Sequence, residues 1–180
     1  MSLHADAVAV LSAWSAPDPA QDRLRRAYLR HLDTHPDAMT RGCVPDHLTG
    51  SALIVSADST MVLLTLHARF RRWLQTGGHC EDDATLAGAA LREATEESGV
   101  PRLVIDPVPV LLSRHEVPCG PVRPARHLDV QFLCVAPADA VPAISAESLD
   151  LAWFPVDELP ADADDSVSAL VSACRNRLGR

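Results

Sequence analysis

Residues 78–100, GHCEDDATLAGAALREATEESGV, constrain this chain more than any other stretch. Glu93, Glu96 and Glu97 are spaced i, i+3 and i+4, and a helix advances about 100° per residue, so the three carboxylates lie on one helix face. Their repulsion costs about 0.2–0.5 kcal/mol per pair, and a hard cation such as Mg²⁺ converts that cost into binding energy. Two glycines precede the helix, where the backbone can come close to a ligand. The stretch predicts a glycine loop feeding a helix with a cation-binding face.

The spacing resembles the Nudix box, which reads Gly, five residues, Glu, seven residues and then Arg-Glu-aliphatic-any-Glu-Glu-any-Gly-aliphatic. From Gly78 to Val100 every box position is filled at that spacing except one, because Ala84 stands where the family has its first Glu. The neighbouring acids Glu81, Asp82 and Asp83 are candidates for a replacement carboxylate; the alternative is that Asp82 and Asp83 cap the helix. We identify the chain as similar to the Nudix hydrolase family; the plainer alternative is a surface helix with an acidic face.

This resemblance implies hydrolysis of a pyrophosphate bond in a nucleoside diphosphate linked to another moiety, with Mg²⁺ or Mn²⁺ as cofactor. It assigns metal binding to Glu96 and Glu97, and makes Glu93 a ligand or the general base. Arg92 would orient a glutamate by a charge-assisted hydrogen bond, and a plain salt bridge to Glu96 is compatible with that role. The Gly77 carbonyl would complete the metal coordination. The expected catalytic residues are therefore Arg92 and the three glutamates.

Nudix proteins often recruit a further acid from outside the box. Our first expectation for this additional metal ligand is Glu147, in a loop before a short strand, with Glu116 and Asp129 as alternatives. Any of the three is also a candidate for an ordinary surface acid.

Histidines and one cysteine near the box offer other chemistry. His79, His115 and His127 are structural residues, substrate hydrogen-bonding groups or, with Asp129, parts of an unusual metal site. Cys80 follows the glycine pair, but no Cys-His-Asx arrangement accompanies it, so we expect a bystander thiol.

The substrate's base and phosphates need aromatic and basic side chains. Phe70, Trp73 and Trp153 are the aromatic candidates, with core packing as their expected role and base stacking as the alternative. The arginines available for phosphate binding are Arg69, Arg71, Arg72, Arg114, Arg123 and Arg126.

Composition excludes several classes of protein. With 47% hydrophobic and 22% charged residues, the 180-residue chain has material for one folded domain and an added segment. A net charge of −8 argues against binding a nucleic acid polymer. No apolar run is long enough to span a membrane, and no basic leader begins the chain. Five widely spaced cysteines without a CxxC pair indicate reduced thiols, so we expect a cytoplasmic protein.

Strand patterns alternate with helical ones, which predicts an α/β fold, and the resemblance implies a Nudix-like α/β/α sandwich with a mixed sheet. Residues 46–180 form the expected Nudix domain, and residues 1–45 an N-terminal helical extension that packs, mediates a homodimer or acts as a lid. The box helix is expected to start near Asp83, with Asp82 or Asp83 as N-cap, and to stop at Gly99. The other expected elements are helices at 4–15 and 19–34, a hairpin of strands 51–56 and 61–67, strands at 104–112, 126–136 and 149–154, and a closing helix from Asp165.

Two other functions compete with hydrolysis. One is a Nudix-like module that senses a nucleotide without cleaving it; the retained Glu93, Glu96 and Glu97 and the lack of a DNA-binding segment argue against it. The other is an isoprenyl-diphosphate isomerase, which needs a placed cysteine and a distinctive metal-binding histidine set. Cys80 alone is weak support for that isomerase.

Overall fold

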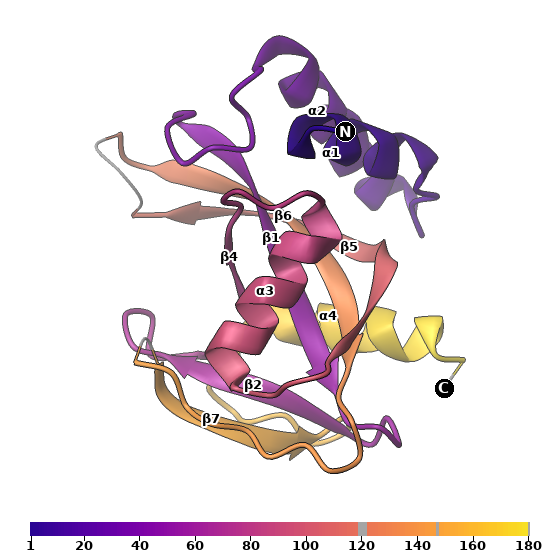
Figure 1. Ribbon diagram of the computed structural model, residues 1–180, viewed down its shortest axis with the longest axis vertical. Coiled ribbons are helices and arrows are strands. Elements are labelled where there is room, and N and C mark those ends of the chain that lie inside the picture. The colour runs from indigo at the N-terminus through magenta and orange to yellow at the C-terminus, as the bar shows by residue number, and fades with distance from the viewer. Residues whose placement is uncertain (119–121, 147, 180) are drawn as a thin grey trace.

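A computed structural model describes residues 1–118, 122–146 and 148–179 (Figure 1). The elements in chain order are α1 (Leu3–Ala13), α2 (Pro19–Thr34), β1 (Asp46–Val55), β2 (Met61–His67), β3 (Trp73–Leu74), β4 (Thr76–His79), α3 (Leu86–Ser98), β5 (Val104–Val117), β6 (Ala125–Val135), β7 (Ser148–Pro155) and α4 (Asp165–Arg177).

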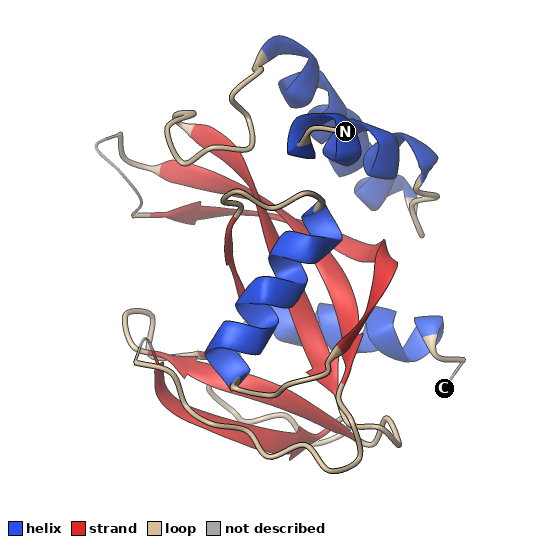
Figure 2. Cartoon of the chain, in the orientation of Figure 1, coloured by secondary structure: helices blue, strands red, loops and turns tan. Residues whose placement is uncertain are grey.

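One mixed sheet of seven strands forms the centre of the molecule, with the order β3-β2-β1-β6-β5. β1 and β6 are parallel along their whole length, and the other pairs are antiparallel. β4 pairs with Thr49–Ala52 in the middle of β1, and β7 pairs with β2. Helices α3 and α4 lie on opposite faces of the sheet (Figures 1 and 2). The α/β/α sandwich with a mixed sheet that the sequence predicted is confirmed.

The two faces of β1 bury different cores because side chains alternate along a strand. Ala52 and Ile54 belong to the core cluster that contains the α3 residues Leu86 and Ala90. Leu53 and Val55 point the other way and pack with α4. The apolar stripe of α4 is the expected one, formed by Val167, Leu170, Val171 and Cys174.

Strands that carry the site are longer than expected. β1 begins at Asp46 rather than at residue 51, because its parallel pairing with β6 is unbroken from Asp46 opposite Arg126 onward. β5 continues to Val117 and has a register irregularity near its prolines, as a bent strand should. The hairpin of β1 and β2 is confirmed.

The N-cap prediction for the box helix was wrong. Thr85 is the N-cap, and its hydroxyl accepts a hydrogen bond from the Gly88 N–H at 3.0 Å. Asp83 is not available for capping because its carboxylate binds Arg92. At the other end Gly99 adopts φ +63°, the left-handed cap that glycine accommodates without strain, as predicted.

Helices α1 and α2 pack onto the end of the sheet beside α3 (Figure 1). The buried Tyr28 donates a hydrogen bond to the Ser113 carbonyl on β5 at 2.8 Å. Gln21 binds the backbone of Leu112 through both its amide oxygen and its amide nitrogen. From α1, Asp6 accepts the Leu86 N–H at 2.8 Å. The two helices thus share the core of the domain that follows them.

Helix length bears on membrane insertion. The first-turn proline and Asp18 cap start α2, which at 16 residues is the longest helix described. A bilayer-spanning helix needs about 20 mostly apolar residues. Within the described ranges, no helix has both the length and the apolar character to cross a membrane.

Candidate active site

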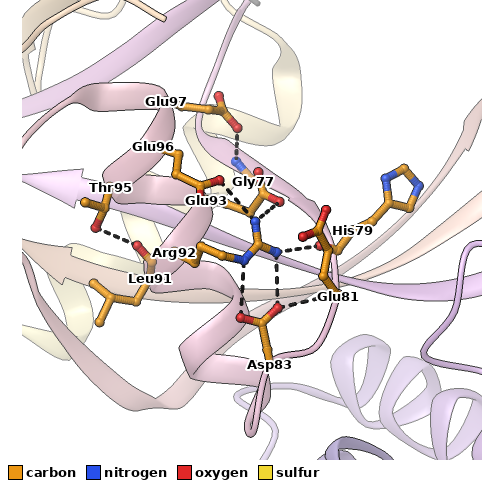
Figure 3. A network of polar contacts seen from close by, with 10 residues as sticks. All are labelled: Gly77, His79, Glu81, Asp83, Leu91, Arg92, Glu93, Thr95, Glu96 and Glu97. Atoms are coloured by element: carbon orange, nitrogen blue, oxygen red, sulfur yellow. Dashed lines mark hydrogen bonds and ion pairs between the residues drawn. The ribbon is translucent and has the colours of Figure 1, made fainter.

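Arg92 is the centre of the polar network on α3 (Figure 3). Its guanidinium donates to Glu93 at 2.9 Å and to Glu96 at 3.1 Å, and it forms a two-pronged pair with Asp83. It also donates to the backbone carbonyl of His79 at 3.0 Å. The hydrogen bond that Arg92 donates to Asp83 raises the pKa of Arg92 above its ordinary value. One fixed cation therefore orients two box glutamates and the adjoining strand.

Asp83 is the acid nearest in sequence to Ala84 that contacts the box arginine. Burial alone would raise the pKa of the Asp83 carboxyl, but the hydrogen bonds from Arg92 hold it below its ordinary value. The Ala84 position that lacks the box glutamate is exposed, whereas the Asp83 side chain is only 12% exposed. Glu81 and Asp82 are exposed, whereas Arg92 donates two hydrogen bonds to Asp83. Asp83 is thus the loop carboxylate that anchors Arg92.

The other glutamates approach the backbone of the glycine pair. The carboxylate of Glu97 accepts the Gly77 N–H at 3.0 Å. A Cβ placed on Gly78 would lie 2.7 Å from the carboxylate of Glu93, so only glycine fits there without displacing that side chain. We call Glu93, Glu96 and Glu97 the box carboxylates. Glu93 and Glu97 therefore lie beside the glycine pair, and Arg92 holds Glu96 next to Glu93.

A cavity of about 510 Å³ opens beside these groups. Gly77, Gly78 and Glu97 form one part of its wall, and His79 and His127 another. None of its lining residues comes from α1 or α2 in the described part of the chain. The lining comes from the sheet, from loops beside it, and from Glu97 of α3 and Ser166 of α4.

The cavity wall and the α4 core share one face of the sheet. Leu53 and Val55 occupy this face in the second half of β1, beneath α4. The first half, which α4 leaves uncovered, places polar residues at the alternate positions of both parallel strands. These residues are His47, Thr49 and Ser51 on β1 and His127, Asp129 and Gln131 on β6.

Asp129 is the buried acid of this wall. Its carboxylate accepts hydrogen bonds from Thr49 at 3.0 Å, Ser51 at 2.6 Å and Gln131 at 3.1 Å. Burial raises its pKa, against the opposing effect of these hydrogen bonds. Both carboxylate oxygens have donors, so Asp129 is bound within the wall rather than presented as a ligand. Of the other outside acids, Glu116 lines the cavity, and Glu147 lies outside the described residues.

Three histidines from three strands meet at one end of the wall. One ring nitrogen from each of His47, His79 and His127 lies within 4.8 Å of the others. We call these residues the histidine cluster. His115 stands beside it, with its ring centroid 5.5 Å from that of His127. The sequence named three of these four residues and missed His47, which it left outside the expected strand.

A signal for His47 is present in the sequence. His47-Leu48-Thr49 and His127-Leu128-Asp129 share the same alternation of histidine, leucine and polar residue. Strands with matching alternation can pair side by side, and the structure aligns His47 with His127. The pattern alone, however, does not show which strand pairs with which.

Cys80 is buried in the core cluster beneath α3. Burial raises the pKa of its thiol to about 12. A protonated, enclosed thiol is a poor nucleophile, so the expectation of a bystander is supported.

The aromatic and basic candidates divide between core and cavity. Trp73 is buried and packs edge-on against Phe154, as expected for a core residue. For Phe70 the expectation of core packing was wrong: its side chain is 42% exposed and lines the cavity. Arg126 is engaged with Asp46. The arginines that line the cavity are Arg69 and Arg72, together with Arg41, which the sequence did not single out.

Comparison with known proteins agrees with this geometry. A family model described as the NUDIX domain matches residues 46–172. No curated protein matches the sequence.

Similar solved structures include a NUDIX family hydrolase from Clostridium perfringens, at 23% identity and TM-score 0.59, covering 73% of this chain and 97% of that one. A C. elegans Ap4A hydrolase in a binary complex is 15% identical, with TM-score 0.59 and coverages of 73% and 97%. An ADP-ribose pyrophosphatase from Streptococcus suis is 19% identical, with TM-score 0.54 and coverages of 74% and 92%. At these identities the likeness is one of fold.

Proposed function

Because the chain belongs to the NUDIX domain family, we propose that it hydrolyses a pyrophosphate bond in a nucleoside diphosphate linked to another moiety, using Mg²⁺ or Mn²⁺. The observation that carries this proposal is the position of Glu93 and Glu97 against the glycine pair, with Glu97 and both glycines on the cavity wall. Two of the similar structures are named for Ap4A and ADP-ribose, and we extend that class of substrate to this chain.

The donors around the glycine pair fit a hard divalent cation. They are carboxylate oxygens on one helix face, and the missing side chain of Gly78 leaves beside Glu93 a space that a Cβ would fill. The proposed ligands are Glu93, Glu96 and Glu97, with the Gly77 carbonyl. Bound there, the cation would shield the phosphate oxygens and lower the pKa of a coordinated water. Of the outside acids, Glu116 is placed on the cavity wall, and Glu147 stays a proposal from the sequence alone.

The protein's own residues position the reactants. Arg92 holds Glu93 and Glu96 through hydrogen bonds to both side chains, which keeps two anions side by side before substrate arrives. Glu93 then serves as a ligand or accepts the proton of the attacking water. Among the cavity arginines, Arg69 and Arg72 supply forked donors for phosphate oxygens.

Phe70 is the proposed contact for the base. Phe70 lies against His67, with ring centroids 4.6 Å apart, and the two rings form part of the same wall. A nucleobase can stack on such a surface without base-specific hydrogen bonds. The net charge of −8 favours a small substrate over a nucleic acid polymer.

A panel of nucleotide diphosphate derivatives, incubated with Mg²⁺ and separately with Mn²⁺, tests the proposal. Chromatography should detect phosphate-bearing products from at least one member. Glu97→Gln should abolish turnover, whereas the matched change Glu158→Gln, at an exposed acid outside the cavity, should leave it unchanged. Turnover that survives Glu97→Gln would overturn the metal assignment.

The same panel separates the competing functions. Saturable binding without turnover would favour the sensing module. The isomerase needs a histidine set and a placed cysteine; the histidines are present, but the Cys80 thiol is buried with a raised pKa. Conversion of isopentenyl diphosphate with no cleavage of any nucleotide would favour that enzyme despite this cysteine.

A further inference from the structure

We propose that His47, His79 and His127 form a second metal site, which binds a Zn²⁺-class ion and opens onto the cavity. The site is separate from the box carboxylates in its donors and in the elements that hold them. It goes beyond the proposed hydrolysis, which needs only the carboxylate site.

The geometry comes close to that of a bound ion. The three candidate ligand nitrogens lie within 4.8 Å of one another, and the ring centroids are separated by 4.9 to 5.1 Å. Zinc–nitrogen bonds of about 2.0–2.1 Å in a tetrahedral arrangement place ligand nitrogens about 3.4 Å apart. The nitrogens therefore need to close by no more than about 1.4 Å.

Two ring nitrogens of the histidine cluster lack a hydrogen-bond partner in the described part of the chain. The Nδ1 atom of His47 lies 3.1 Å from the Cys43 carbonyl oxygen, which can only accept a hydrogen bond, so Nδ1 carries the proton and Nε2 the lone pair. Among the described residues, Nε2 of His47 and Nε2 of His127 are buried without a hydrogen-bond partner. Such nitrogens are costly when unsatisfied, and an ion between them would satisfy both. A carbonyl on the far ring nitrogen is the usual orienting contact of a metal-binding histidine.

The strands hold the three residues in register. His47 on β1 is directly beside His127 on β6, and His79 on β4 is opposite Thr49, two residues along β1. The backbone of His79 is also tied to Arg92, while its imidazole points away from that guanidinium (Figure 3). Ligands on paired strands are held more precisely than ligands on loops.

The protonation state suits metal binding. Burial lowers the pKa of His79 to about 4 and that of His127 to about 3, and it also lowers the pKa of His47. The imidazoles are therefore neutral near pH 7, which is the form that binds a metal.

Donor chemistry selects the class of ion. Three imidazoles favour Zn²⁺ and related transition metals over Mg²⁺, which prefers oxygen ligands. Asp129 is not a fourth donor, because Thr49, Ser51 and Gln131 already bind its carboxylate. Since His79 and His127 both line the cavity, water or a phosphate oxygen from the cavity would supply the fourth ligand.

Zinc binding by the full-length protein tests the site directly, without substrate and without Mg²⁺. Metal-free protein should take up one equivalent of Zn²⁺ in isothermal titration calorimetry, and elemental analysis after gel filtration should find it bound. His79→Ala and His127→Ala should each weaken binding by more than ~100-fold, since loss of a ligand exceeds the 10–100-fold cost of losing an orienting contact. Co²⁺ in place of Zn²⁺ should give the visible absorption of a low-coordinate site in the wild type and not in these two histidine variants.

Three further variants make the result decisive. His127→Gln keeps a polar side chain and replaces His127→Ala if circular dichroism shows that the alanine variant does not fold. His35→Gln is the matched control, because His35 stacks on His31 at the end of α2, outside the cavity. Glu97→Gln should lose hydrolysis and keep the zinc. A wild type that binds no zinc at micromolar concentration, or zinc that is lost in Glu97→Gln and kept in the histidine variants, would overturn the proposal and leave the hydrolase proposal standing.

Discussion

The box carboxylates and the histidine cluster lie on opposite sides of β4. Each brings like groups close together, but the two are stabilised in different ways. The carboxylates are anionic, come from one helix and are compensated by Arg92, which touches Glu93 and Glu96. The histidines are neutral, come from three strands and are kept neutral by burial. The first arrangement suits a hard ion that exchanges with substrate, and the second suits a more tightly held transition metal.

β4 lets one short strand serve both clusters. Gly78 faces Glu93, and the next residue, His79, points to the other side of the sheet as strand alternation requires. Arg92 reaches the His79 carbonyl, so the two clusters share one backbone contact. Substitutions in this region should therefore affect one cluster without the other, or show that the two clusters are coupled.

Arg92→Ala should have the largest effect. It leaves Asp83, Glu93 and Glu96 without their common cation and releases the His79 carbonyl. Turnover should fall by more than ~100-fold and the free energy of unfolding by about 2 kcal/mol. Zinc affinity should fall by no more than ~10-fold, because only the backbone of one ligand is loosened. Arg92→Lys keeps the positive charge without the forked guanidinium, and it should restore stability more than turnover. An equal loss of zinc affinity and turnover in Arg92→Ala would show that the two clusters form one site.

Gly78→Ala should affect the box carboxylates and leave the histidine cluster unchanged. The added Cβ would lie 2.7 Å from the Glu93 carboxylate, which can swing aside because it ends a flexible side chain. Turnover should drop ~10–100-fold, while thermal unfolding and zinc titration change little. Loss of zinc binding in this variant would contradict the assignment of the two clusters to opposite sides of β4.

Asp83→Ala should reduce turnover by about 10-fold, because Arg92 loses the partner that anchors it outside the helix. The double change Asp83→Ala with Ala84→Glu tests whether the usual box position can take over that role. Recovery of kcat in the double variant is expected, with Ala84→Glu alone close to wild type. Wild-type kcat in Asp83→Ala would mean that Arg92 needs no such anchor.

Tyr28→Phe should have the smallest effect on either cluster. The lost hydroxyl leaves the Ser113 carbonyl without its 2.8 Å donor, which should lower the free energy of unfolding by about 1–2 kcal/mol. Hydrolysis and zinc binding should stay at wild-type levels, because α2 contributes no residue to the cavity lining described. Urea unfolding and the two assays check this, and a selective loss of turnover would indicate that α2 also positions the site.

Local patterns determined much of the molecule in advance. Helix and strand periodicity depends on neighbours a few residues apart, so the box helix, its acidic face and its glycine stop could be predicted, as could the amphipathic α4. The contact between Arg92 and Glu96 is also local, one helical turn apart. The family resemblance supplied the sandwich, which the sheet order confirmed.

Other features depended on which distant segments pair. Thr85 and the aspartates before it are all good N-cap residues, and the choice fell to Thr85 because Arg92 binds Asp83. Phe70 is exposed because its loop turns toward the cavity, which periodicity does not describe.

The sequence by itself determined the box carboxylates, because i, i+3 and i+4 spacing on a helix is a property of one short segment. Only the tertiary structure decided the histidine cluster, because His47, His79 and His127 are separated by long stretches of chain and meet through the pairing of β1 with β4 and β6. Strand register is set by backbone hydrogen bonds between segments, and a shift of one residue would turn a histidine to the opposite face.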